Sequence, residues 1–288
     1  MGIYMKRIEN SQFDEERSLY NIKNTLVTNC IFAGPKDGES VLKETREIKV
    51  NDCQFSLRYP LWHAKKYELV NSYFDKDTRA PIWYSDEGLI NNCTFKGIKL
   101  LRECHNTTIR NSRINSIEFG WKCSNIEVED CDIDSEYIFL DSNDISLKNT
   151  QFKGKYSFQY IKHLVIDHCQ LDTKDAFWHS EDIIVRNSLV KGEYLGWFSK
   201  NLTLINCQII GTQPLCYCEN LKLINCTMEA CDLSFEYSDV EADIIGHVDS
   251  IKNPKSGTIT LDSLGELIEE NSIMETSGKV IIRKNHSL

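Results

Sequence analysis

Three charged side chains recur at a fixed interval in the middle of the chain. Lys122 is the nineteenth residue after Glu103, Asp141 is the nineteenth after Lys122, and Arg102 directly precedes the first of them. A lysine between two carboxylates could remove the proton α to the carboxylate of a uronate. The arginine could then neutralise the substrate's negative charge. These four residues are therefore candidate catalytic residues for β-elimination.

The same carboxylates admit two other interpretations. Glu103 and Asp141 could be the acid and the base of an inverting glycosidase, because two repeats of a stacked structure separate their backbones by about 9–10 Å. Alternatively, opposite charges on successive turns could form a ladder of ion pairs, which avoids repulsion between like charges. No catalytic motif accompanies the three residues, so the sequence favours the ion-pair ladder over catalysis.

The interval between these charges is also the period of most of the chain. Asn–Cys dipeptides align a column of Cys, Ser and Thr, here called the thiol column: Cys30, Cys53, Ser72, Cys93, Ser112, Cys131, Thr150, Cys169, Ser188, Cys207 and Cys226. Each is preceded by a residue of the Asn column, which runs from Asn29 to Asn225. Asn adopts the left-handed backbone conformation readily, so this column predicts a tight corner in every repeat.

Apolar columns flank the thiol column, three residues before it and two residues after it. A repeat of about 19 residues is too short for a pair of helices but accommodates three short strands with bends. The sequence therefore predicts an all-β parallel β-helix of eleven or twelve coils, since the signature of a leucine-rich repeat is missing. We expect one domain over residues 1–288, with coils over 19–250 and caps over 1–18 and 251–288.

All five tryptophans fall in one column, ten residues before the thiol column. This tryptophan column also holds Lys43, Arg102 and Gln159, which would be costly to bury, so we expect it to face solvent from the arched middle of a short strand. Rings that fill the core are the alternative. The next position is the rim column, and together the two columns form an exposed ribbon typical of a binding surface. The candidate ligand-binding residues are Trp62, His63, Trp83, Tyr84, Trp121, Tyr160, Trp178, His179, Trp197 and Tyr217.

Several stretches resemble a known bacterial family of uncharacterised proteins in the pectin-lyase-like superfamily. They include ESVLKETREIKVNDCQFSLRYPLWH, LLRECHN, KDAFWHSE, GTQPLCYC and FEYSDVEADIIGHVDSIKNPKSG, and the resemblance covers nearly the whole chain. It implies a single-stranded right-handed parallel β-helix but no activity and no catalytic residues. In the wider superfamily the carbohydrate cleft lies on the first parallel sheet, so the resemblance implies that the ribbon lies on that sheet.

Composition indicates which binding partners and which cellular compartment to expect. The net charge of −10 argues against binding to nucleic acid or to an anionic membrane. No apolar segment is long enough for a membrane span, and the start has no signal-peptide pattern, so we expect a cytoplasmic protein. The twelve cysteines show no Cys-x-x-Cys spacing, and we expect compact core fillers without disulfides. His63 and His179 lack further ligands nearby, and we expect neither a metal nor a cofactor.

The sequence supports two hypotheses about function. In the first, the ribbon binds an oligosaccharide or another extended ligand, and the protein could be a polysaccharide lyase or a glycoside hydrolase. In the second, the protein is a non-catalytic scaffold and the ribbon is a protein contact surface, for which Trp and Tyr are equally suited. The sequence does not specify the oligomeric state.

Overall fold

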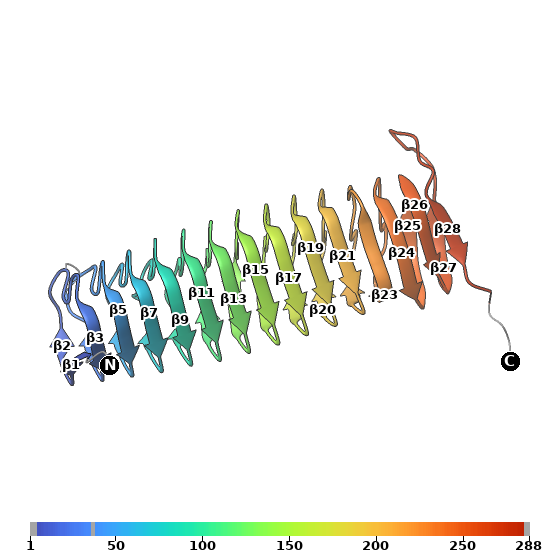
Figure 1. Ribbon diagram of the computed structural model, residues 1–288. Coiled ribbons are helices and arrows are strands. Elements are labelled where there is room, and N and C mark those ends of the chain that lie inside the picture. The colour runs from blue at the N-terminus through green and yellow to red at the C-terminus, as the bar shows by residue number, and fades with distance from the viewer. Residues whose placement is uncertain (1–4, 36–37, 285–288) are drawn as a thin grey trace. The chain divides into compact units, whose positions relative to one another are not determined.

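Hydrogen bonds between parallel strands repeat along the chain at the period found in the sequence. The computed structural model describes residues 5–35 and 38–284, and these ranges contain twenty-eight strands and no helix. His105 lies opposite Ser124, its equivalent one repeat later, in a parallel ladder. The predicted parallel β-helix is thereby confirmed (Figure 1). The described residues include no helical segment with the length and apolar character needed to cross a membrane.

The chain divides into two compact units, residues 1–146 and residues 147–288. The strands of unit 1 are β1 Lys6–Glu9, β2 Gln12–Phe13, β3 Lys23–Thr28, β4 Ile31–Phe32, β5 Arg46–Asn51, β6 Gln54–Phe55, β7 Lys65–Val70, β8 Tyr73–Phe74, β9 Asp86–Asn91, β10 Thr94–Phe95, β11 His105–Arg110, β12 Arg113–Asn115, β13 Ser124–Glu129 and β14 Asp132–Glu136. Strand β15, Asn143–Lys148, contains the boundary between the units.

Unit 2 continues the same alternation of long and short strands. Its strands are β16 Gln151–Lys155, β17 Lys162–Asp167, β18 Gln170–Asp172, β19 Glu181–Arg186, β20 Leu189–Lys191, β21 Lys200–Ile205, β22 Gln208–Ile210, β23 Leu221–Glu229, β24 Asp239–Ile245, β25 His247–Lys252, β26 Ser256–Leu261, β27 Ser263–Ile268 and β28 Lys279–Ile282. In β23 the long and the short strand of one coil are continuous.

The structure has about fourteen coils, more than the eleven or twelve predicted. The difference arises at the two ends, because the segments interpreted as caps also contain coil strands. Strands β1 and β2 lie within residues 1–18, and they pair with β3 and β4 of the next coil. Beyond residue 250, β26 pairs with β24 and β28 pairs with β26. At both ends of the chain the residue types of the columns change, so the repeat is hard to recognise in the sequence. The ladder of paired strands nevertheless continues through these segments.

The Asn column forms the predicted corner. Its residues have left-handed backbone conformations, with φ of 53° at Asn92 and 49° at Asn111. Their side-chain amides bond along the column, as where Asn92 Nδ2 donates to Asn71 Oδ1 at 2.7 Å. Each amide therefore stabilises both a strained backbone position and its contact with the neighbouring coil.

A second column of left-handed residues lies at the second position of the long strands from β3 to β21 and continues directly before β23. Its members are Asn24, Glu47, Lys66, Glu87, Asn106, Asn125, Asp144, His163, Asp182, Asn201 and Asn220. Where two Asn are adjacent they form a second amide ladder, with Asn125 Nδ2 donating to Asn106 Oδ1 at 2.7 Å and Asn220 Nδ2 to Asn201 Oδ1 at 2.8 Å. The sequence analysis missed this corner because charged residues interrupt the amides.

The core columns point inward as predicted. Phe32, Phe55, Phe74 and Phe95 are at most 1% exposed and stack on one another with ring centroids 4.3–4.7 Å apart. The cysteines of the thiol column are at most 4% exposed. Cys30 Sγ, for example, donates to the carbonyl oxygen of Thr28 at 3.3 Å. Thiols and hydroxyls therefore fill one interior column in successive coils, and the phenylalanine rings fill the column two residues after it.

Replacing Asn125 by Ala should lower the free energy of unfolding by about 1–2 kcal/mol. The change removes the amide bond to Asn106 and leaves an alanine at φ 53°. Urea unfolding followed by circular dichroism measures the loss. Asn125→Gly is the control, since glycine accepts this φ, and its loss should be smaller. An alanine variant as stable as the unchanged protein would contradict this account of the corner.

The buried thiols should resist alkylation in the folded protein. Burial raises the pKa of Cys53 to about 12 and that of Cys93 to about 11, so both are neutral thiols at pH 8, whereas the thiolate is the nucleophile. Cys226, whose pKa is lowered by its hydrogen bond with Cys207, is fully buried. We expect little native labelling by iodoacetamide and twelve added groups after denaturation without reductant. A mass showing fewer groups by pairs would indicate disulfides.

Candidate functional site

A turn segment with isolated β-bridges, rather than a continuous strand, carries the tryptophan and rim columns. In the coil of Trp121, Glu118, Gly120 and Lys122 have φ of 60°, 78° and 54°, so left-handed residues alternate with other conformations. Phe119 on one side of this stretch is fully buried, whereas Trp121 is half-buried and Lys122 is exposed. The outward placement of the ribbon is therefore as predicted. The strand expected there is reduced to isolated parallel bridges, which join Trp83, Arg102 and Trp121 on successive coils. The implied place on a cleft-bearing sheet stays a prediction.

The tryptophans of unit 1 are stacked face to face along the column. Trp62 and Trp83 have ring centroids 5.1 Å apart and planes inclined by 6°. The guanidinium carbon of Arg102 lies 4.4 Å from the centroid of Trp83 and 4.8 Å from that of Trp121. Arg102 thus occupies the position of a ring in the stack and makes a cation–π contact on each side.

In unit 2 the same column places Trp178 and Trp197 in a stack, with centroids 5.4 Å apart and planes inclined by 6°. Each tryptophan of the chain also donates its indole N–H to a backbone carbonyl of the following coil, at 2.6–2.8 Å. Gln159 makes the equivalent bond through its amide, to Asp175 O at 2.9 Å. The column therefore joins successive coils, which is a structural role.

The rim rings are stacked as well. In unit 1, His63 and Tyr84 have centroids 5.0 Å apart. In unit 2 four rings form one stack, with successive centroid distances of 5.0, 5.0 and 4.8 Å: Tyr160, His179, Phe198 and Tyr217. A sugar stacks on the face of a ring, and inside these stacks another ring covers the faces. The rim rings of unit 2 therefore present mainly their edges to a ligand.

Arg102 is fixed by an ion pair that the sequence analysis missed. Its Nη2 lies 3.1 Å from Glu118 Oε2, and Lys99 Nζ lies 3.1 Å from the same oxygen. Arg102 Nε is buried and has no hydrogen-bond partner in the described part of the chain. Lys99 and Glu118 could have been found because they are one full repeat apart, three positions before the tryptophan column.

Glu103, Lys122 and Asp141 lie on successive coils of unit 1, as predicted. Glu103 N donates to Trp121 O at 2.9 Å, and Lys122 N donates to Leu140 O at 3.0 Å. All three side chains are exposed, and none of them forms an ion pair or a hydrogen bond with another described residue. The ion-pair ladder expected as the structural alternative is therefore absent at these positions.

Trp121 is the aromatic residue that lies among these charges. Arg102 covers one face of its ring, Tyr137 meets it edge-on at a centroid distance of 6.5 Å, and among the described residues no ring stacks on its other face. Leu140 follows it in the column. The structure thus brings together Trp121 and three charged side chains that have no partner among the described residues, which suits a polar ligand with an apolar side.

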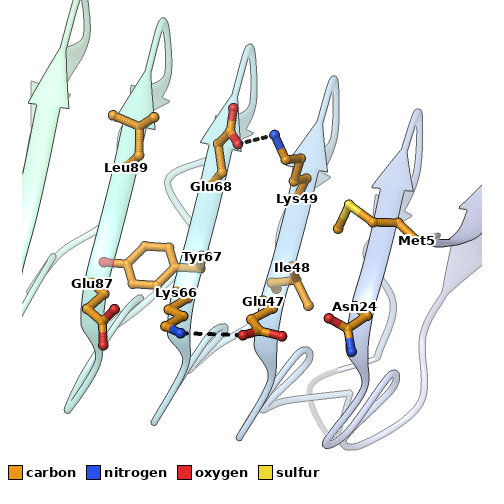
Figure 2. A pocket seen from close by; sticks show the side chains of 10 residues that line it. All are labelled: Met5, Asn24, Glu47, Ile48, Lys49, Lys66, Tyr67, Glu68, Glu87 and Leu89. Atoms are coloured by element: carbon orange, nitrogen blue, oxygen red, sulfur yellow. Dashed lines mark hydrogen bonds and ion pairs between the residues drawn. The ribbon is translucent and has the colours of Figure 1, made fainter. Parts of the chain in front are cut away.

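A separate groove of about 410 Å³ lies on the outer face of strands β3, β5, β7 and β9. Figure 2 shows Lys66 directed at Glu47 and Lys49 directed at Glu68 along its two walls, at 3.4 and 2.7 Å. Met5 and Leu89 lie toward its ends. Because these wall charges are already paired, the groove offers a ligand few free polar groups, and we do not include it in the candidate site.

A family model described as "Protein of unknown function (DUF3737)" matches residues 6–282. The chain belongs to this family. The resemblance to an uncharacterised β-helix family is thereby confirmed. No curated protein matches the sequence.

Solved structures with a similar course of the chain include a surface adhesin of Streptococcus pneumoniae, PfbA. It is 11% identical, with 81% of this chain and 82% of the adhesin covered and a TM-score of 0.42. The A-module of the Azotobacter vinelandii mannuronan C-5 epimerase AlgE6 is 10% identical, with 96% and 89% covered and a TM-score of 0.31. Likenesses at this level carry no information about activity.

Replacing Trp197 by Ala should lower the free energy of unfolding by about 2–3 kcal/mol. The change removes a stacked, half-buried ring and the bond from its Nε1 to Gln213 O at 2.8 Å, although less is lost than for a fully buried tryptophan. Urea unfolding followed by circular dichroism tests this. Trp197→Phe keeps a ring in the stack and should lose less. Unchanged stability of the alanine variant would show that the column does not join the coils.

Proposed function

We propose that this protein binds an oligosaccharide at the surface formed by Trp121, Arg102, Glu103, Lys122 and Asp141. One observation carries the proposal. The side chains of Glu103, Lys122 and Asp141 are exposed, have no partner in the part of the chain that the structure describes, and lie beside a ring with one face free of ring stacking. Sugar hydroxyls need directional hydrogen-bond partners, and the apolar side of a sugar ring packs against an aromatic face.

The arrangement of the coils favours an extended ligand. Successive coils are separated by about 4.8 Å, the spacing of hydrogen-bonded strands, so the three charged groups form a row about 10 Å long. A ligand lying along this row would meet one charged group in each coil. A monosaccharide would reach only part of it, so we propose that affinity increases with chain length.

We propose binding without chemistry. A catalytic acid or base is usually tuned by burial or by a close charged partner. Glu103, Lys122 and Asp141 are exposed and form no ion pair with described residues. The lyase and glycosidase hypotheses therefore have less support than simple binding, and the experiment below includes turnover as an outcome.

The second candidate function, a protein contact surface, is favoured by the rim stack of unit 2. Tyr160 and Phe198 are 53% and 41% exposed, and the faces inside the stack are covered. An exposed phenylalanine has no hydroxyl to offer a sugar. Ring edges with an occasional hydroxyl suit a protein partner better than a glycan.

Calorimetric titration with a panel of neutral and uronate oligosaccharides tests the proposal. We expect binding that weakens about tenfold or more in Trp121→Ala, since a central aromatic contact is lost. Trp197→Ala is the matched control, because it removes a ring of the same column outside the proposed surface and should leave affinity unchanged. Lys122→Ala and Asp141→Asn should weaken binding while the protein remains folded.

Three other outcomes are informative. If no oligosaccharide binds, or if both tryptophan variants lose affinity equally, the proposed site is wrong. If Phe198→Ala removes the capture of a protein partner while the sugar panel gives no signal, the scaffold function replaces the proposal. If sugar products accumulate and Glu103→Gln, Lys122→Ala or Asp141→Asn stops their formation with binding retained, the protein is an enzyme.

A further inference from the structure

The C-terminal end of unit 2 exposes more apolar surface than a strand ladder normally leaves uncovered. Leu267, Ile281 and Ile282 are 40%, 49% and 47% exposed, and Ile273 and Met274 in the preceding loop are 84% and 42% exposed. Single exposed apolar residues are ordinary on a protein surface, but here five lie within sixteen positions of the sequence, and Leu267 and Ile282 line one hollow and so form an apolar patch. Such patches mark contact surfaces.

The last strands also have free edges. Within the described residues, β27 pairs with β25 and β28 pairs with β26, and neither has a second partner. A hollow of about 460 Å³ is lined by Ser263, Leu264, Gly265, Leu267, Val280 and Ile282. Free edges usually carry charges or are covered, because they readily pair with another chain. This edge carries Glu266 and Lys279, but between them Leu267, Val280 and Ile282 line the hollow, which is therefore suited to receive apolar side chains from outside.

The loop between β27 and β28 projects beyond the strands and is held in place (Figure 1). The backbone N–H of Ile273 donates to the hydroxyl of Tyr237 at 3.1 Å. Nearer β28, Ser277 N donates to Lys255 O at 2.9 Å and Gly278 N to Pro254 O at 3.1 Å. The loop is thus anchored through the backbone of Ile273 and again after the tip, and the side chains of Ile273 and Met274 are exposed to solvent.

Around the patch, Arg283 is paired with Asp243 and Asp262, but six other charged side chains of both signs are not paired with described residues. The glutamates are Glu266, Glu269, Glu270 and Glu275, and the lysines are Lys279 and Lys284; none of their side chains forms an ion pair with a residue that the structure describes. Many charged side chains on the coils are paired, as Lys200 is with Glu219 at 3.1 Å. A surface with unpaired charges of both signs is complementary to a second copy of itself.

We propose that two copies of this chain associate through their C-terminal ends. In this dimer the apolar tip of each loop, Ile273 and Met274, packs into the hollow of the other copy, and the lysines of one copy meet the glutamates of the other. The two contacts are equivalent, so the association closes as a twofold dimer. The inference is independent of the proposed ligand surface in unit 1.

The other end of the chain argues against a head-to-tail arrangement. The N-terminal edge strand β1 exposes Lys6, Arg7 and Glu9, and its Ile8 is half-buried. Joining this edge to the C-terminal patch would place charged side chains against Ile281 and Ile282. The charged groups would lose water without gaining a partner, which costs free energy. The head-to-tail arrangement would also leave open ends and produce fibres. Contact between two C-terminal ends avoids both consequences.

Sedimentation velocity of the full chain over a range of concentrations tests the proposal. We expect a monomer–dimer equilibrium whose dissociation constant rises about tenfold or more in Ile273→Asp and in Ile281→Lys. Both side chains are exposed, so thermal unfolding of dilute protein should change little. The matched control is Ile184→Asp, which alters an isoleucine that is 41% exposed on β19, and it should leave the equilibrium unchanged.

Mixing two defective variants identifies the geometry. Ile273→Asp damages the tip and Leu267→Asp damages the hollow, so the mixture restores one intact contact and should dimerise more than either variant alone. A monomer at all concentrations, or equal weakening by Ile184→Asp, would overturn the proposal. Species that grow beyond a dimer with concentration would indicate a head-to-tail assembly and would also overturn it.

Discussion

The hydrogen bonds that set each coil in register with the next are the constraint on which the rest of the structure depends. They place equivalent residues of successive coils directly beside one another, so every column becomes a stack of side chains at strand spacing. Asn amides then bond to Asn amides, as at Asn92 and Asn71, and phenyl rings lie on phenyl rings, as at Phe55 and Phe74. A side chain is therefore selected for its fit to its neighbours in the column as well as to the core.

The same register limits what the ribbon can do. The tryptophans stack on one another, and their indole N–H groups donate to the next coil. The ring faces and the N–H groups that a ligand would contact are therefore largely occupied. Aromatic residues in a solenoid column thus do not by themselves indicate a binding platform. Side chains that are free to bind a ligand lie where the residue type changes along a column. A residue that differs from its neighbours in the column cannot stack on them or bond with them as an identical residue would.

The sequence predicted the columns well because periodicity and burial are properties of residue type. The thiol, Asn and core columns and the loops at the two insertions follow from spacing, and Lys65 still lies opposite Asp86 across an insertion. The outward ribbon follows from the charged and polar residues in its column. Backbone conformation was harder to predict. Leu61 and Phe139 adopt φ of 59° and 51°, which residues of their type rarely do, and only contacts with adjacent coils hold them there. A continuous strand was therefore predicted where the segment is mostly turn, with isolated parallel bridges.

The candidate site could be predicted in part because its charged residues differ from the other residues of their columns. Glu103, Lys122 and Asp141 stand out because the rim column is otherwise mostly aromatic, so their proximity followed from period and register. Whether they would pair with one another depended on side-chain directions that no spacing specifies. Arg102 shows the opposite case: its charge suggested a solvent-facing group, yet rings on both sides and Glu118 hold it in the stack. An arginine can replace a tryptophan in such a column because its planar cation binds both neighbouring faces, and its charge then makes Trp121 a different surface from the tryptophans that stack on rings.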